Sequence, residues 1–589
     1  MERDISKLAN YWASAEVFDM ETRNEIKTLV DKQEENELAE RFYKDLEFGT
    51  GGLRGILGAG SSRMNIYNVR KASQAFADYL NEFFHNEKER RIAISYDNRR
   101  FSREFAEATA EVMAANGIHS YLTKELRPTP VLSFMVRHFQ CHGGICVTAS
   151  HNPPNYNGYK VYWQTGGQIV PPHDQKVIQR YLAMESYEVI KHISFADGLK
   201  KGLIHEVGKE LDEVYFSKVL SLATGRGDKN IKIVFTPLHG TGGYPIAECL
   251  KRYGFHNVSI VPEQAKPDSE FPTVRFPNPE DPEALEMAIA LGKKENADLI
   301  MATDPDTDRI GMVVRDGDDY MMLNGNQIGC LLTDFLLNSY QASGRLPKNP
   351  LVVKTIVTTD MQAKIATHYG AECLETLTGF KWICQLVEDL ETGKVKPYRE
   401  YVCGGEESYG FLAGSFVRDK DAVSAFCLAA EMVASFKEQG KTVSQVLDEL
   451  YRRHGVYLEH LHTVTLPGRV GAAKIQEMMD TLRQDPPKIF AGVSVKKCRD
   501  FQNSQEMEQK DSQFVRSGSI DLPSSNVLQF ILEDGSKISA RPSGTEPKIK
   551  FYFSVHQEPD SGIDLDTMKK ACQDRLQQLI STFVKLAES

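Results

Sequence analysis

The sequence predicts an α/β protein with three similar βαβ-type domains, each built on a mixed sheet, followed by a smaller α+β domain. Strand-like and helix-like segments alternate in three successive stretches, and each stretch closes with an apolar strand that leads into a polar loop. A chain of 589 residues has room for about four domains of about 150 residues each. We expect these domains over residues 1–207, 208–322, 323–454 and 455–589.

The first domain is expected to start with charged helices and to continue as a βαβαβ unit. Apolar residues recur at helical spacing in residues 24–46, and the glycine-rich stretch 48–65 ends this pattern. Ser102 is available as the N-cap of a later helix, and Gly117 is its stop signal. Helices are expected over residues 69–84, 102–117 and 130–139, and strands over 91–97, 118–123 and 143–150.

The same alternation recurs twice and then changes. The second stretch is expected to place strands and loops at 231–243, 258–261 and 297–311, with helices at 244–254 and 282–296. The third is expected to place strands at 351–359, 371–376 and 401–411, with helices at 360–370 and 379–390. The last segment differs, because paired strands at 493–501 and 526–555 lie between helices at 471–484 and 565–586.

Composition excludes several classes of protein. The net charge of −11 argues against a general nucleic-acid or membrane-surface binder, since such partners attract clustered Lys and Arg. The ten cysteines have no CxxC pair, which does not favour zinc and suits reduced thiols. The charged N-terminus does not fit a signal peptide, and no run approaches the roughly 18 apolar residues of a membrane span. We expect a cytoplasmic protein that acts on small molecules, as a monomer or a homodimer.

Three alternating aspartates follow the strand of the second stretch, in "DPDTDR". Carboxylates this dense at Asp304, Asp306 and Asp308 repel one another unless a hard cation binds them, which suits Mg²⁺. An EF-hand is excluded because its sixth and twelfth positions hold arginines here. A dehalogenase-type aspartyl nucleophile fits less well, since Thr307 stands one place early. A solvated acidic turn is the other interpretation, and the preceding apolar strand favours the metal site.

Ser150 ends an apolar strand in "TASHNPPNYNGYK". It lacks the GxSxG elbow of serine hydrolases, and His151 is its immediate neighbour, a spacing from which we expect the two side chains to diverge. A phosphorylated serine fits better, because a nearby Mg²⁺ would offset the charge of about −2 on its phosphate. Lys160 would then serve as general base or as a phosphate partner.

Two further loops suit a sugar phosphate. In "RPSGTEP", Arg541 offers a planar fork to a phosphate, and the next residues add hydroxyls and backbone N–H groups. A plain hairpin end explains this loop equally well. In "GGEESYG", Glu406 and Ser408 would face the same way on an extended backbone and contact hydroxyls. "FVRDKD" adds Arg418 and Lys420, and the other interpretation of these two residues is a surface charge cluster.

Together these loops resemble those of the α-D-phosphohexomutases. "TASHNPPNYNGYK" resembles the phosphoserine loop of that family, "DPDTDRIG" its metal loop, "GGEESYG" its sugar loop and "RPSGTEPKIK" its phosphate loop, in the family's order. Shorter stretches agree, among them "FGTGGLRG", "YDNRRFS", "RPTPVLSF", "TPLHGTGG" and "LTGFKWI". The length and the stretches "EFGTGGLRGILGAGSSRMN" and "LTGFKWI" are most similar to the branch that holds phosphoglucomutases and phosphopentomutases.

The resemblance implies a four-domain, heart-shaped enzyme with a central cleft. Phospho-Ser150 would transfer its phosphoryl group to a sugar monophosphate, and the bisphosphate formed would return its other phosphate. Asp304, Asp306 and Asp308 would bind one Mg²⁺ together with Ser150. The resemblance places around the reacting phosphoryl group Arg54, Arg309, His151 and Lys160. It assigns to substrate binding Glu406, Ser408, Lys420, Gly379, Lys381, Arg541, Ser543, Gly544 and Thr545.

We therefore expect a phosphoglucomutase that interconverts glucose 1-phosphate and glucose 6-phosphate, with glucose 1,6-bisphosphate as intermediate and activator. A phosphopentomutase or a phosphomannomutase would differ in how the cleft reads the ring hydroxyls. A glucose-1,6-bisphosphate synthase would share the motifs but take phosphate from an acyl phosphate. A non-catalytic sugar-phosphate sensor is disfavoured, because Ser150 and the aspartates are all present.

Overall fold

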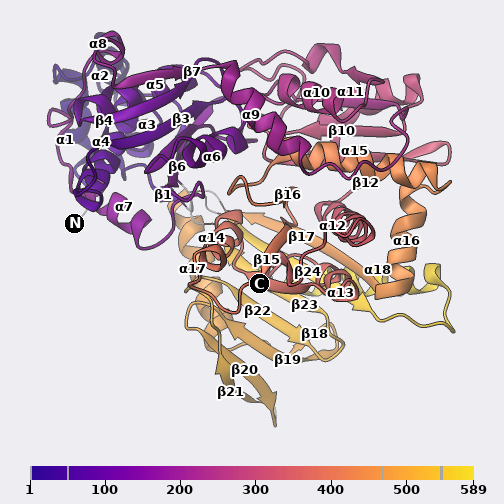
Figure 1. Ribbon diagram of the computed structural model, residues 1–589. Helices are drawn as coiled ribbons and strands as arrows, with labels where there is room; N and C mark the ends of the chain where they lie inside the picture. Colours follow the sequence, from indigo (N-terminus) through magenta and orange to yellow (C-terminus); the bar gives the residue numbers. More distant parts are fainter. Residues whose placement is uncertain (1–2, 50–51, 467, 512, 544–547, 589) are drawn as a thin grey trace. The chain divides into compact units, whose positions relative to one another are not determined.

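The computed structural model describes residues 3–49, 52–466, 468–511, 513–543 and 548–588 (Figure 1). The chain forms two compact units. The first consists of Met1–Leu323, Cys384–Lys396 and Tyr409–Ser435. The second consists of Asn324–Ile383, Pro397–Ser408 and Phe436–Ser589. In the described part of the chain, no helix is long and apolar enough to cross a membrane.

The first unit begins with a seven-stranded mixed sheet, ordered β1-β2-β6-β5-β3-β4-β7. The pairs β5–β3, β3–β4 and β4–β7 are parallel, and β1, β2 and β6 add an antiparallel edge. The strands are β1 (Phe48–Gly49), β2 (Gly52–Ile56), β3 (Arg90–Tyr96), β4 (Ile118–Thr123), β5 (Gly143–Val147), β6 (Tyr156–Trp163) and β7 (Ile204–Val207). The helices are α1 (Ile5–Ser14), α2 (Met20–Asp31), α3 (Glu35–Phe42), α4 (Ile66–Phe83), α5 (Ser102–Ala115), α6 (Thr129–His138), α7 (His173–Ala183) and α8 (Phe195–Lys200).

The second sheet of this unit has five strands in the order β12-β11-β10-β8-β9. Its central strands pair in parallel, β10 with β8 and β8 with β9, whereas β11 and β12 return antiparallel. The strands are β8 (Ile233–Thr236), β9 (Val258–Ile260), β10 (Leu299–Thr303), β11 (Ile310–Asp316) and β12 (Asp319–Leu323). The helices of this part are α9 (Lys209–Leu220), α10 (Gly243–Arg252), the short 3₁₀ helix η1 (Pro262–Gln264) and α11 (Pro282–Glu295).

The second unit contains a parallel arrangement, β14-β13-β15. The strands are β13 (Pro350–Thr355), β14 (Glu372–Thr376) and β15 (Glu400–Glu406), and β16 (Gly410–Ala413) follows in the chain as part of the first unit. The helices around this part of the chain are α12 (Gly325–Ala342), α13 (Met361–His368) and α16 (Val443–His454). Residues of α14 (Phe380–Glu391) and α15 (Ala422–Glu438) are divided between the two units.

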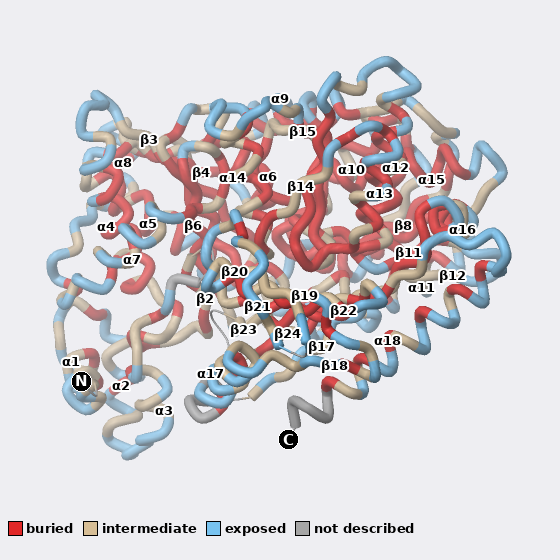
Figure 2. Tube along the Cα trace, turned by 90° about the horizontal axis from the view of Figure 1, so that it is seen from below, coloured by how far each residue is buried: buried red, intermediate tan, exposed pale blue. Residues whose placement is uncertain are grey.

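The last sheet is antiparallel and ordered β17-β24-β23-β22-β19-β20-β21, with β18 paired to β19. Its strands are β17 (Val456–Thr465), β18 (Ile489–Phe490), β19 (Val493–Asp500), β20 (Gln505–Lys510), β21 (Gln513–Ser519), β22 (Leu528–Leu532), β23 (Lys537–Pro542) and β24 (Lys548–Gln557). Two helices, α17 (Gly468–Gln484) and α18 (Leu565–Glu588), accompany it. Buried residues follow the central strands, whereas β21 is mostly exposed (Figure 2).

The predicted fold class is therefore confirmed: three α/β parts with mixed or parallel sheets precede a β-rich C-terminal part. The predicted N-cap is wrong. Helix α5 includes Ser102 as its first residue, and Phe101 precedes it in a left-handed conformation without a side-chain cap. The hydroxyl of Ser102 instead donates to Asp97 Oδ1 at 2.7 Å. A buried carboxylate competes successfully for this hydroxyl, so the capping rule does not apply here.

An ionic network around the buried ammonium of Lys354 joins β13, β14 and β23 within the second unit. Lys354 Nζ lies 2.7 Å from Glu375 Oε1 and 2.9 Å from Asp360 Oδ1, and Asp360 also pairs with Lys537. Glu459 lies beside this network, and its buried Oε1 accepts no hydrogen bond from a described residue. Burial, reinforced by Asp360, raises the pKa of Glu459 to about 7, although Thr359, Lys537 and Lys354 act to lower it.

We expect Glu459→Gln to stabilise the protein at pH 8 by about 1–3 kcal/mol and to change stability much less at pH 5. Because the folded-state pKa is raised, the folded protein holds a proton that the unfolded chain releases above about pH 4.3. The free energy of unfolding of the wild type therefore falls as the pH rises toward 7. Glutamine does not ionise, so the variant should not show this fall. Urea denaturation at both pH values measures the difference. The exposed Glu533→Gln is the control, and equal effects of both variants would contradict the prediction.

Candidate active site

Ser150 lies directly beyond β5 and points toward the metal loop. The residue is 4% exposed, and its Oγ donates to Asp304 Oδ2 at 2.8 Å. Its φ of 51° is left-handed, a conformation that costs a non-glycine residue about 1 kcal/mol or more and persists only where neighbours hold it. This backbone also corrects one expectation. The Ser150 and His151 side chains do not diverge, because Oγ lies 3.2 Å from His151 Nδ1.

The three predicted metal ligands come together at the end of β10. Asp304, Asp306 and Asp308 are buried, and each offers an oxygen within 4.8 Å of the others. One oxygen of Asp306 and one of Asp308, both Oδ1, are buried and accept no hydrogen bond from any residue that the structure describes. Buried anionic oxygens without donors are costly unless a cation binds them. The donor set is all oxygen and fits a hard divalent ion such as Mg²⁺.

The "TPLHGTGG" loop packs against the loop that carries the three aspartates. Thr241 donates both its N–H and its hydroxyl to Pro305 O, at 2.8 and 2.9 Å. A Cβ on Gly240 would lie 2.4 Å from Pro305 Cα, so only glycine permits this close approach. The motif thus acts by shaping the turn that carries the aspartates.

Charges around the triad are strongly interdependent. Burial and the neighbouring carboxylates of Asp306 and Asp308 raise the pKa of Asp304 well above its usual range. Burial also acts to raise the pKa of Asp306, but the ammonium of Lys160 outweighs it and lowers that pKa. Lys160 Nζ lies 2.7 Å from Asp306 Oδ2 and 3.3 Å from Asp308 Oδ2. Although burial lowers the pKa of Lys160, these two carboxylates raise it, so the group is an ammonium in this arrangement.

The "RDKD" loop brings a second lysine to the same cluster. Lys420 Nζ lies 3.2 Å from Asp308 Oδ2 and 3.2 Å from Asp419 Oδ1. Asp419 also accepts hydrogen bonds from Tyr162 and Gln168, at 2.6 and 2.9 Å. Burial opposes ionisation of Asp419, but Lys420 and Lys160 hold its pKa below the usual value. Lys420 is therefore no surface charge, and the alternative of a surface cluster is wrong, since it is 7% exposed.

The two predicted arginines contact different parts of the site, Arg54 the Ser150 loop and Arg309 the aspartate triad. Arg54, on β2, donates from Nη1 to Asn152 Oδ1 in the Ser150 loop at 2.9 Å. Arg309 follows the triad directly, and its backbone N–H donates to Asp304 Oδ1 at 3.1 Å. Its guanidinium pairs with Glu280 at 2.5 Å. Both arginine side chains are therefore already in contact with protein groups, Arg54 with Asn152 and Arg309 with Glu280.

Sequence reasoning missed several residues that hold the site. Thr129 donates to Asp306 twice, from its N–H to the backbone O at 2.9 Å and from Oγ1 to Oδ2 at 2.8 Å. Asp419 and Arg99 were likewise not assigned a role. These residues lie in the short stretches "RPTPVLSF", "RDKD" and "YDNRRFS", which mark the segments but not the individual side chains. Spacing alone does not reveal that these segments meet the metal loop.

The remaining predicted residues belong to the second unit. Glu406 is the last residue of β15 and 7% exposed, whereas Ser408 lies in the following turn. The extended backbone assumed for this pair is therefore wrong. Gly379 has a φ of 111°, and Lys381 Nζ lies 5.2 Å from the centre of the Trp382 ring.

The phosphate loop stands between two paired strands. Arg541 is on β23, opposite Lys550 of β24, and Ser543 N–H donates to Lys548 O at 2.7 Å. The predicted residues Gly544 and Thr545 lie outside the described residues. Both predictions for this loop, a hairpin end and a phosphate-binding site, therefore stay predictions.

A serine hydroxyl beside a buried carboxylate cluster, with lysines at hydrogen-bond distance from the carboxylates, is the kind of site that transfers phosphoryl groups. Family models agree. Those described as "Phosphoglucomutase/phosphomannomutase, alpha/beta/alpha domain" I, II and III match residues 45–188, 213–317 and 324–454.

Curated relatives and solved structures are similar to this chain over most of its length. A phosphoglucomutase of Staphylococcus saprophyticus is 35% identical over 534 residues, which cover 90% of this chain and 94% of that protein. One of Staphylococcus aureus (strain MRSA252) is 36% identical, with 90% and 93% covered. The fold matches a putative phosphomannomutase of Thermus thermophilus at 21% identity and TM-score 0.64, covering 93% of this chain and 100% of that one.

A further structure, the open form of the Paramecium phosphoprotein pp63/parafusin, has a TM-score of 0.64 at 17% identity, covering 92% of this chain and 96% of that one. At these identities the structural matches show the fold alone. The sequence matches show the family as well, since they extend over nine-tenths of the chain at 35% and 36% identity. The chain belongs to the phosphoglucomutase/phosphomannomutase family, a family of phosphosugar mutases. The predicted family is confirmed.

Proposed function

We propose that this protein interconverts glucose 1-phosphate and glucose 6-phosphate through a phosphorylated Ser150 and bound glucose 1,6-bisphosphate. The observation that carries the proposal is the 2.8 Å contact between Ser150 Oγ and Asp304, which sets the hydroxyl against the buried carboxylate triad. The curated relatives of this chain, which are named phosphoglucomutase, support the choice of sugar.

The proposed reaction consists of two phosphoryl transfers. First a sugar hydroxyl attacks the phosphorus on Ser150, a new sugar O–P bond forms, and the bond between phosphorus and Ser150 Oγ breaks. The sugar hydroxyl loses its proton, and Ser150 recovers one as its hydroxyl forms again. After the bisphosphate turns over, Ser150 attacks the other phosphate, and the same bonds form and break in reverse. No water is consumed, so position changes without net hydrolysis.

We propose His151 as the side chain that takes part in proton transfer. His151 Nδ1 lies 3.2 Å from Ser150 Oγ, within hydrogen-bond reach. Lys160, predicted as general base or phosphate partner, is held as an ammonium by Asp306 and Asp308. An ammonium cannot accept a proton and one with a raised pKa donates poorly, so we propose the second role, the binding of phosphoryl oxygens. Arg54, Arg309 and Lys420 would add positive charge around the transferring group.

The residues that would hold Mg²⁺ are Asp304, Asp306 and Asp308, with the Ser150 phosphate as a further ligand. The ion would supply Lewis-acid stabilisation of charge on the transferring oxygens. In the second unit, we propose that Glu406, Ser408, Gly379 and Lys381 bind the sugar. Arg541 and Ser543, with Gly544 and Thr545, would bind the distal phosphate.

A substrate panel tests the proposal. With Mg²⁺ and a trace of glucose 1,6-bisphosphate, we expect kcat/KM for glucose 1-phosphate to exceed that for mannose 1-phosphate and ribose 1-phosphate by at least about tenfold, or about 1.4 kcal/mol of discrimination. A clear preference for ribose 1-phosphate would replace the proposal with a phosphopentomutase. Bisphosphate formation that needs an acyl phosphate donor, with little isomerisation, would identify a bisphosphate synthase instead.

A further inference from the structure

The Ser150 loop has little regular hydrogen bonding of its own. Residues 148–155 connect β5 to β6, and within them Ser150 N–H donates to Thr148 Oγ1 at 2.9 Å and Asn152 N–H donates to Ala149 O at 3.1 Å. Ser150 itself has a left-handed φ of 51°. Buried carbonyls need donors, and the loop does not supply enough of them itself.

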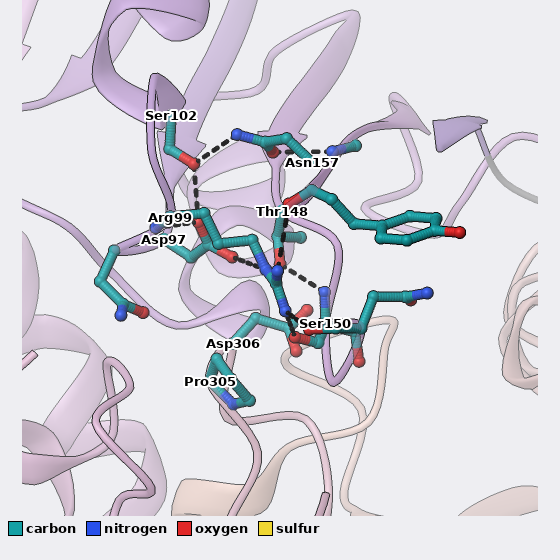
Figure 3. Close-up of polar contacts among 12 residues, drawn as sticks. Asp97, Arg99, Ser102, Thr148, Ser150, Asn157, Pro305 and Asp306 are labelled. Atoms are coloured by element: carbon teal, nitrogen blue, oxygen red, sulfur yellow. Dashed lines mark hydrogen bonds and ion pairs between the residues drawn. The ribbon is translucent and has the colours of Figure 1, made fainter. Parts of the chain in front are cut away.

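Arg99 supplies these donors. Its Nη2 donates to Ser150 O at 2.6 Å and to Asn152 O at 2.5 Å. Its Nη1 donates to Pro153 O at 2.8 Å and to Tyr156 O at 3.1 Å. One guanidinium thus binds four carbonyls of a single seven-residue segment, as Figure 3 shows for Ser150 and its surroundings.

The geometry leaves Arg99 no means of contacting a substrate. A guanidinium has five N–H groups, of which Nη1 and Nη2 carry four. Those four serve the four carbonyls, and Nε is buried 3.4 Å from Asp97 Oδ2 without a hydrogen bond to a described residue. The side chains of Arg99 and Asp97 are both 0% exposed. Burial lowers the pKa of Arg99 to about 10 despite Asp97, so the group is still charged at neutral pH.

Asp97 links this guanidinium to both ends of the loop. Its N–H donates to Val147 O at the end of β5, at 3.1 Å. Its Oδ1 accepts from Ser102 Oγ at 2.7 Å, and Ser102 Oγ accepts in turn from Asn157 Nδ2, on β6, at 3.0 Å. Figure 3 shows this chain of contacts from Asp97 through Ser102 to Asn157. The network explains why Ser102 does not cap α5.

We propose that Arg99 is the positioning residue that holds the Ser150 loop in its left-handed shape, so that Oγ stays beside Asp304. The proposal rests on the proposed function, because it treats Ser150 as the group that carries phosphate. Arg99 acts through the loop backbone and touches neither phosphate nor sugar. Its removal should therefore slow phosphoryl transfer and leave substrate affinity nearly unchanged.

Arg99→Lys and Arg99→Met are the test variants. Lysine keeps the charge but cannot reach four carbonyls, and methionine removes both charge and donors. A displacement of Ser150 by about 1 Å is expected to lower kcat by about 100-fold in Arg99→Met, with KM changed less than about threefold. Arg99→Lys should recover part of that loss. Phosphorylation of Ser150 by labelled glucose 1,6-bisphosphate should slow in parallel.

Arg100→Met is the matched control. Arg100 is the next residue, is half exposed, and pairs with Glu270 on the surface, so its loss should leave kcat within about twofold. Ser102→Ala provides a milder variant should Arg99→Met not fold. It breaks the link between Asp97 and Asn157, and we expect a smaller loss of kcat, again at constant KM.

Hydrogen exchange separates this proposal from the proposed function. Amide exchange of residues 148–158, followed by mass spectrometry without substrate, should rise in Arg99→Lys but not in Arg100→Met, whatever sugar the enzyme uses. If the wild type shows no mutase activity but the exchange difference appears, only the proposed function fails. Unchanged exchange, unchanged kcat, or a raised KM at constant kcat in folded Arg99→Lys would overturn the positioning role.

Discussion

Ser150→Ala is expected to lower mutase activity by more than about 10⁴-fold, because no other hydroxyl can take over a nucleophile on which both transfers depend. The folded structure should tolerate the change, since the lost oxygen contacts only Asp304 and His151 among the described residues. Intact-mass analysis after incubation with glucose 1,6-bisphosphate provides the second measurement. The wild type should gain the mass of one phosphoryl group, and the variant should not.

Ser120→Ala is the matched control for this experiment. Ser120 is a buried serine on β4, and its hydroxyl has no hydrogen-bond partner among the described residues. It should keep both full activity and the added mass. An active Ser150→Ala enzyme, or one that still gains the phosphoryl mass, would refute the role of Ser150.

The site could be predicted where a loop directly follows an apolar strand. Ser150 and Asp304 stand beyond β5 and β10, and a strand pattern with a polar end is visible in one sequence. The family resemblance assigned Asp306 to the metal and Lys160 to the reacting phosphoryl group, but it did not predict that their side chains pair. No pattern within residues 143–163 or 297–311 shows that these two side chains meet at 2.7 Å.

Arg99 shows why the rest was out of reach. In sequence it is one of two adjacent arginines in "YDNRRFS", and nothing distinguishes it from Arg100. In the structure one is buried against four carbonyls and the other is exposed beside Glu270. That difference depends on the left-handed φ of Ser150, more than fifty residues away. Tertiary contacts of this kind leave no local signature.

The same limit applies to the antiparallel edge strands. The alternation of strands and helices predicted the parallel centre of the first sheet, but β2 and β6 pair across about a hundred residues. Strand β6 itself contains Gly158, which permits a close approach of the backbone. A Cβ at this position would lie 2.4 Å from Thr148 O. The pairing of β2 with β6 places Arg54 and Lys160 on neighbouring strands. Both side chains thereby reach the site, Arg54 at the Ser150 loop and Lys160 at the aspartate triad.

The carboxylates of the site outnumber the lysines that pair with them. Four buried carboxylates, those of Asp304, Asp306, Asp308 and Asp419, face two ammonium groups, Lys160 and Lys420. Four negative charges against two positive ones leave two negative charges when all are ionised. A raised pKa at Asp304 reduces this excess by holding a proton. A divalent ion would remove the excess fully and displace that proton, so its binding should weaken at low pH.

Asp306→Asn is accordingly expected to remove both activity and the response to Mg²⁺. We expect kcat to fall by about 10³-fold, because charge on the transferring phosphoryl group loses several kcal/mol of stabilisation. In the wild type, Mg²⁺ at about 100 times its Kd should add about 2.7 kcal/mol to the free energy of unfolding. The variant should show little of this gain. Thermal unfolding with and without Mg²⁺, and with EDTA, measures it.

Asp318→Asn is the control for that variant, since Asp318 is exposed in the turn between β11 and β12. It should keep the Mg²⁺-dependent shift in Tm and full activity. Asparagine at position 306 still accepts from Thr129 through its side-chain oxygen, so loss of the Mg²⁺ response cannot be attributed to that hydrogen bond. The ammonium of Lys160 would lose its nearest carboxylate and should turn more fully to Asp308. If Asp306→Asn kept the Mg²⁺-dependent stabilisation, the triad would not be the metal site, and the stabilising role of the ion in phosphoryl transfer would have to be sought elsewhere.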